Sequence, residues 1–137
     1  MSSMVIGLAS GSLEKLVVTS TVTGGAVALD MEVDIYLLLG GAYAFRKDVA
    51  GGAGTYADRP ELAEEMAAGM AGNAVSAPLD SLRALKADGT VRIHCCGTAG
   101  KIWGAGALGD FVDLVDDIVG IAEYISRCED ADVVQVF

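Results

Sequence analysis

The stretch Thr90-Val-Arg-Ile-His-Cys-Cys-Gly-Thr-Ala-Gly-Lys101 decides the fold, because it has the pattern of a buried strand that continues through a glycine turn into a helix. Residues 90–94 are rich in β-branched side chains, and Asp88-Gly89 supplies a turn in front of them. Gly97 allows a sharp exit from the strand, and Thr98 suits the N-cap position of the helix. A strand, a tight turn and a helix in this order indicate an α/β fold.

The same alternation recurs along the whole chain. Further strands are predicted at 4–9, 33–39, within 111–118, and at 132–137, and helices at 13–28, 61–70, 78–87, 99–105 and 121–128. Residues 43–55 are poor in periodicity and predict a loop or a poorly ordered helix. The pattern therefore predicts one domain over 1–137, built as three α/β/α layers around a mainly parallel sheet of about five strands, a flavodoxin-like build.

Composition excludes several classes of partner. The 137 residues are 53% hydrophobic and carry 19 acidic against 9 basic side chains, which gives a net charge of -10. This charge repels nucleic acid and anionic lipid, so neither is an expected partner. The longest apolar run, at 35–45, is broken by glycines and is too short to span a membrane. Three cysteines, two of them adjacent, suit a reducing compartment, and we expect a soluble cytoplasmic protein without a signal peptide.

Three of the predicted strands end in small or polar turns. Since the carboxyl ends of parallel strands lie at one edge of a sheet, these turns are expected to converge on a single pocket. The residues predicted to line that pocket are Ser10, Gly11, Gly40, Gly41, Gly97 and Thr98.

Cys96 is the strongest candidate nucleophile of that edge. It lies at a strand end beside a helix amino terminus, with Lys101 nearby, and such surroundings stabilise a thiolate. His94 shares a strand face with Cys96 by alternation and is a candidate base, whereas Cys95 points to the other face. Both cysteines can equally be small apolar residues of the core, and His94 can be a hydrogen-bonded core residue. Cys128 is expected to serve packing.

Two phosphate-binding patterns are incomplete in this chain. Gly104-Ala-Gly-Ala-Leu-Gly109 has the spacing of a dinucleotide fingerprint but follows a predicted helix, and 97–101 lacks the first glycine and the magnesium-binding hydroxyl of a phosphate loop. One histidine and three cysteines also make a poor zinc site. We therefore predict no cofactor and no metal.

The chain resembles the DsrE/DsrF-like sulfur-relay family over nearly its whole length. The resemblance rests on residues 5–15, the Gly-Gly-Ala-Tyr-Ala-Phe-Arg-Lys segment at 40–47, the cysteine strand with Gly104 eight residues after Cys96, and the ending at 131–137. It implies that a cysteine at the end of the third strand, Cys96 by position, carries sulfur as a persulfide or related adduct. The adjacent Cys95 leaves open which thiol of the pair is charged.

Two functional hypotheses of different kinds remain, beside a purely structural one in which the chain is an assembly subunit whose cysteine site has lapsed. In the first, the chain is a sulfur carrier that transfers sulfane sulfur between donor and acceptor proteins and assembles as a homo-oligomer. In the second, it is a flavodoxin-like module that binds a small ligand or a nucleotide at the same edge without thiol chemistry.

Overall fold

The computed structural model describes residues 1–50 and 56–137, and its centre is a five-stranded, wholly parallel sheet. The strand order across the sheet is β4-β3-β2-β1-β5. The strands are β1 (Ser3–Leu8), β2 (Glu32–Leu37), β3 (Val91–Cys96), β4 (Asp117–Val119) and β5 (Val133–Val136). The predicted α/β fold with a parallel sheet of five strands is thus confirmed.

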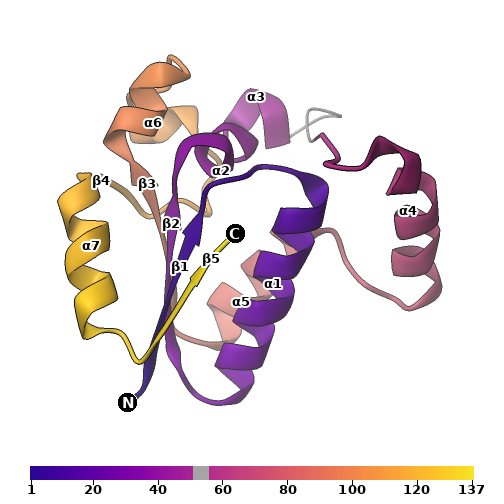
Figure 1. Cartoon of the computed structure of the whole chain (residues 1–137), viewed down its shortest axis with the longest axis horizontal. Coiled ribbons are helices and arrows are strands. Elements are labelled where there is room, and N and C mark those ends of the chain that lie inside the picture. Colours follow the sequence, from indigo (N-terminus) through magenta and orange to yellow (C-terminus); the bar gives the residue numbers. More distant parts are fainter. Residues whose placement is uncertain (51–55) are drawn as a thin grey trace.

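Helices cover both faces of the sheet and its carboxyl edge. Figure 1 shows α1 and α5 on one face, α7 on the other, and α2, α3 and α6 above the ends of the strands. Because α7 follows β4 at one edge, it carries the chain across this face to β5 at the other edge. The helices are α1 (Leu13–Ala28), α2 (Leu39–Ala44), α3 (Lys47–Ala50), α4 (Ala63–Gly72), α5 (Pro78–Asp88), α6 (Gly97–Ile102) and α7 (Ile121–Asp130), with short 3-10 turns at Pro60–Leu62 and Leu108–Asp110.

The core lies mainly between the sheet and the α1/α5 layer. Residues of β1, β2 and β3 that alternate along each strand are almost fully excluded from solvent there, with Ile6, Ile35 and Ile93 paired side by side in register. Ser12 caps α1, since its hydroxyl accepts a hydrogen bond from the Lys15 N–H at 3.2 Å. The predicted start of this helix is therefore correct.

Three local predictions differ from the structure. Gly40 and Gly41 belong to α2 and do not form a turn after β2. The helix after β3 begins at Gly97, so its N-cap residue is Cys96 and not Thr98. Residues 43–55, predicted as a loop or a poorly ordered helix, contain the end of α2 and the four-residue α3 instead of a loop, while 51–55 lie outside the described residues.

Helix α4 lies outside the compact layers. In Figure 1 it stands beyond α1, away from the sheet, and no residue within it is buried. Its Met66 helps to line a shallow pocket with Glu14, Leu62 and Glu65. Among the described residues, no helix combines the length and the apolar character needed to cross a membrane.

Candidate functional site

Cys96 lies where β3 passes into α6, at the carboxyl edge of the sheet. Its backbone is extended, with φ −66° and ψ 123°, and it is the N-cap residue of α6. The residue is 8% exposed and borders an open cavity of about 390 Å³. Thr98 lines the same cavity, and the remaining lining residues are the apolar Leu38, Leu39, Ala99, Ile102 and Ile121. The thiol therefore faces a small apolar hollow that opens to the surface.

The rim of this cavity is made of exposed apolar side chains. Leu39 from α2, Ile102 from α6 and Ile121 from α7 are 49%, 61% and 50% exposed. Three helices that are distant in sequence thus place branched aliphatic residues around one thiol. Exposed apolar residues gathered at one place are typical of surfaces that contact another molecule.

Cys95 has the opposite environment. It is fully buried and lies in register beside Leu37 of β2 and Ile118 of β4, in the apolar core. Burial, with a smaller contribution from the neighbouring Cys96, raises the pKa of the Cys95 thiol to about 11. At neutral pH only about one such thiol in ten thousand is ionised. Cys95 and Cys96 were predicted to point to opposite faces of the strand, and their surroundings differ accordingly: Cys95 is inert in the core, whereas Cys96 borders the cavity.

We expect Cys96 to react with a thiol-directed alkylating agent at neutral pH before Cys95 does. The reason is that Cys95 is both closed to the reagent and held in its protonated form, whereas Cys96 borders an open cavity. Brief exposure to iodoacetamide followed by peptide mapping measures the two rates. Equal labelling of the pair, or labelling of the half-buried Cys128 alone, would contradict the assignment.

His94 is held between two carboxylates. Its Nε2 lies 2.8 Å from Asp34 Oδ1 of β2, and its Nδ1 lies 2.6 Å from Asp117 Oδ1 of β4. Burial disfavours the charged ring, but the hydrogen bonds with Asp34 and Asp117 outweigh it and raise the pKa of His94 above its ordinary value. The protonated ring suits this position because both nitrogens can then donate to a carboxylate.

Arg92 adds a second cation to these paired charges. Its Nε and Nη2 donate to the two oxygens of Asp34 at 2.8 and 2.9 Å. Burial would raise the pKa of Asp34, yet the hydrogen bonds from Arg92 and His94 hold that pKa well below its usual range. We call Asp34, Arg92, His94 and Asp117 the charge cluster. It joins β2, β3 and β4 across the face of the sheet that α7 covers.

The geometry does not support His94 as the base for Cys96. Both ring nitrogens are already engaged by carboxylates, and the ring stacks on Tyr36 with centroids 4.6 Å apart. No ring nitrogen remains to accept a proton from the thiol. The alternative stated for His94, a hydrogen-bonded core residue, fits the structure.

The glycines predicted to line the pocket serve mainly close packing of the backbone. A Cβ atom added to Gly11 would lie within 2.2 Å of the Gly40 carbonyl oxygen, and one added to Gly41 within 2.2 Å of the Leu8 carbonyl oxygen. The backbones after β1 and around α2 therefore approach so closely that only glycine fits. Gly11 and Gly41 leave no room for a ligand at this point.

Tyr56 contacts the turn that follows β1. Its hydroxyl accepts a hydrogen bond from the Gly11 N–H at 3.3 Å and lies 3.5 Å from Ser10 Oγ. The structure thus places Thr98 with Cys96 at one cavity, but it does not bring Ser10, Gly11 and Gly41 there. Gly97 is the first residue of α6, directly after the thiol.

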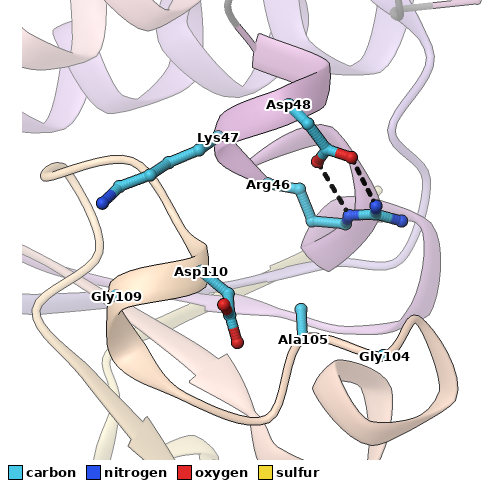
Figure 2. A pocket seen from close by; sticks show the side chains of 7 residues that line it. All are labelled: Arg46, Lys47, Asp48, Gly104, Ala105, Gly109 and Asp110. Carbon is cyan, nitrogen blue, oxygen red and sulfur yellow. Dashed lines mark hydrogen bonds and ion pairs between the residues drawn. The ribbon is translucent and has the colours of Figure 1, made fainter.

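A second hollow, of about 250 Å³, lies between α3 and the loop that follows α6. Figure 2 shows Asp48 and Arg46 joined by two hydrogen bonds on one side, and the Lys47 and Asp110 side chains on the other. Two cations and two carboxylates leave this hollow without an excess of positive charge. Gly104 and Gly109 of the dinucleotide-like pattern lie here, after a helix and not after a strand, so the reason for rejecting that pattern holds.

Sequence reasoning missed the charge cluster. One signal was present, because Asp34 interrupts a strand that is otherwise apolar on both faces, and an unpaired carboxylate is costly in such a position. The partners of Asp34 both lie on β3, with Arg92 58 residues away and His94 60 residues away. Only the strand order brings them together.

Comparisons with known proteins identify the fold but no function. No protein-family model matches the chain, and no curated protein matches it. A solved structure similar to this one is that of MTH1491 from Methanobacterium thermoautotrophicum, described as a protein of unknown function. The two share 13% sequence identity and a TM-score of 0.64 over 98% of this chain and 99% of that one. This likeness shows a common α/β fold.

Proposed function

We propose that this chain is a sulfur carrier in which Cys96 holds a sulfane sulfur atom as a persulfide and passes it between partner proteins. The observation that carries the proposal is the contrast within the cysteine pair. Cys95 is sealed in the core, while Cys96 borders a cavity at the carboxyl edge of the sheet. The resemblance to DsrE/DsrF-like proteins supports the same residue, since it places the sulfur-bearing cysteine at the end of the third strand.

The start of α6 lies directly beside Cys96. Cys96 is the N-cap residue of α6, where the first amide N–H groups have no partner within the helix, and its side chain makes no capping hydrogen bond to them. A helix amino terminus favours negative charge, although a six-residue helix contributes only a small dipole. No carboxylate lines the cavity among the described residues, so no nearby acid opposes this charge.

The loading step is a thiol exchange. The Cys96 thiolate attacks the outer sulfur of a donor persulfide, a new sulfur–sulfur bond forms, and the bond inside the donor breaks. The donor leaves as a thiolate with the electron pair, and Cys96 then carries the transferred sulfur. In the second step an acceptor thiolate attacks that terminal sulfur and Cys96 leaves as a thiolate, so the pair of steps needs no other oxidant or reductant.

The apolar rim suits a protein partner. Leu39, Ile102 and Ile121 stand exposed around the thiol, and a docked protein that covered them would also exclude water from the exchange. The net charge of -10 argues against nucleic acid as that partner. We include self-association in the proposal, because copies of the chain can bury the same aliphatic residues. We also retain the cytoplasmic location, which fits three free cysteines.

A loading experiment tests the proposal. The native protein is incubated with a small-molecule persulfide donor, and we expect its intact mass to rise by one or more sulfur atoms. Peptide mapping should locate the added sulfur on Cys96, and a dithiol reductant should remove it. A protein that gains no sulfur from the donor, or gains it on Cys128 instead, would refute the carrier function.

A further inference from the structure

Three aromatic side chains gather around a pocket that shares no lining residue with the Cys96 cavity. The pocket has a volume of about 340 Å³ and is lined by Gly40, Tyr43, Tyr56 and Trp103. Tyr43 lies in α2, Trp103 is the C-cap residue of α6, and Tyr56 belongs to the segment that leads toward α4. A pocket of this size that is lined mainly by rings is a candidate site for a small ligand.

Two of the three rings, those of Trp103 and Tyr56, are held in place by hydrogen bonds to the backbone. Trp103 Nε1–H donates to the Leu39 carbonyl oxygen at 2.7 Å, and the Tyr56 hydroxyl accepts from the Gly11 N–H at 3.3 Å. The Tyr43 and Trp103 rings lie 5.0 Å apart between centroids and are tilted by 58°. Since their positions are fixed before any ligand arrives, little conformational entropy would be lost on binding.

We propose that this pocket binds an alkylated ammonium group through cation–π contacts. Aromatic rings carry negative faces that attract a cation, and three such rings line this one pocket. The net charge of -10 attracts cations to the protein as a whole. The Tyr43 ring already attracts one cation of the protein, since the Arg46 guanidinium lies 5.6 Å from its centroid.

The same pocket is poorly suited to other ligand classes. A flat heterocycle stacks best between two nearly parallel faces, but the Tyr43 and Trp103 rings are tilted by 58° and the indole N–H is already engaged by the backbone. Among the described residues, the lining offers an anion no cationic side chain. Arg46 lies outside the lining and is paired with both carboxylate oxygens of Asp48.

This inference goes beyond sulfur transfer. The aromatic pocket and the Cys96 cavity are separate, although Leu39 connects them, because its carbonyl oxygen holds Trp103 while Leu39 also lines the cavity of the thiol. Binding of a cation needs no thiol chemistry. The site can therefore be tested on protein whose cysteines are unmodified, and its failure would leave the carrier proposal untouched.

Fluorescence of Trp103 reports directly on this pocket, because it is the chain's single tryptophan. The full chain is titrated with choline at constant ionic strength, and in parallel with the uncharged analogue in which carbon replaces the ammonium nitrogen. We expect a saturable change with choline and a much weaker one with the analogue. A parallel titration uses a peptide that contains trimethyllysine. The ligand with the lower Kd, choline or the peptide, shows whether the preferred ammonium group belongs to a small molecule or to a protein.

A matched pair of variants locates the binding. Tyr43→Leu removes the ring and should raise the Kd for choline by about 2-fold to 30-fold, the range that cation–π contacts span. Tyr43→Phe keeps the ring and should bind within about 2-fold of the parent. An equal response to choline and to its uncharged analogue, no saturable response at all, or an unchanged Kd in a folded Tyr43→Leu protein would overturn the proposal.

Discussion

Replacing Cys96 by serine is expected to abolish sulfur loading while leaving the fold intact. A serine hydroxyl has no appreciable anionic form at neutral pH and cannot form a persulfide, so the transferred sulfur has no acceptor. The fold should tolerate the change because Cys96 is the N-cap residue of α6, and serine is among the residues preferred at that position. Intact mass after treatment with the persulfide donor measures loading, and urea denaturation measures stability.

The neighbouring thiol supplies the control. Cys95→Ala should load as the parent does, because Cys95 is buried among core residues and its thiol is almost wholly protonated at neutral pH. We expect it to cost about 1 to 2 kcal/mol of stability, since it leaves a small space in a packed core. If Cys96→Ser loads normally and Cys95→Ala does not, the assignment within the pair is wrong. If both variants load fully, the sulfur is carried elsewhere.

The fold was predictable from the sequence because its signals are local. Apolar strand-length segments alternate with helical ones, and the Ser12 cap and the proline at the start of α5 mark helix beginnings within a few residues. The strand order was not predictable, because it depends on α7 carrying the chain from one edge of the sheet to the other. No residue within α7 specifies that path.

The glycines at 40 and 41 show how packing overrides a local signal. Two adjacent glycines after a strand favour a turn, since glycine is a poor helix former. In the structure both lie in α2, where Gly41 approaches the Leu8 carbonyl oxygen more closely than any side chain would allow. Gly41 is needed for the close contact of α2 with β1, and the residues adjacent to it in the sequence do not indicate that contact.

The candidate site was predictable only where its signals are local in the sequence. The position of Cys96 follows from the local order of strand, glycine and helix. The role of His94 does not, because its two partners lie 60 and 23 residues away in sequence and meet it only across strands. The aromatic pocket was also missed, since Tyr43, Tyr56 and Trp103 come from separate segments and share no pattern.

Replacing Asp34 by alanine is expected to lower the free energy of unfolding by about 3 to 5 kcal/mol. The Asp34 side chain is 3% exposed and accepts hydrogen bonds from Arg92 and His94. Its removal leaves the half-buried Arg92 without its paired carboxylate and the buried His94 with Asp117 alone, and the cost is the desolvation of the charges that lose their partner. Urea denaturation followed by circular dichroism measures the change.

Asp117→Ala is the matched control because it removes the other carboxylate that contacts the same ring. The Asp117 side chain is 51% exposed, so water can solvate His94 Nδ1 after the change, and we expect a loss of about 1 kcal/mol. If both variants lost the same free energy of unfolding, burial of the carboxylate would not determine how much each ion pair of the charge cluster stabilises the fold. Should sulfur loading in the folded Asp117→Ala protein also match the parent, the role of His94 would be to hold β2, β3 and β4 together beneath Cys96 and not to activate its thiol.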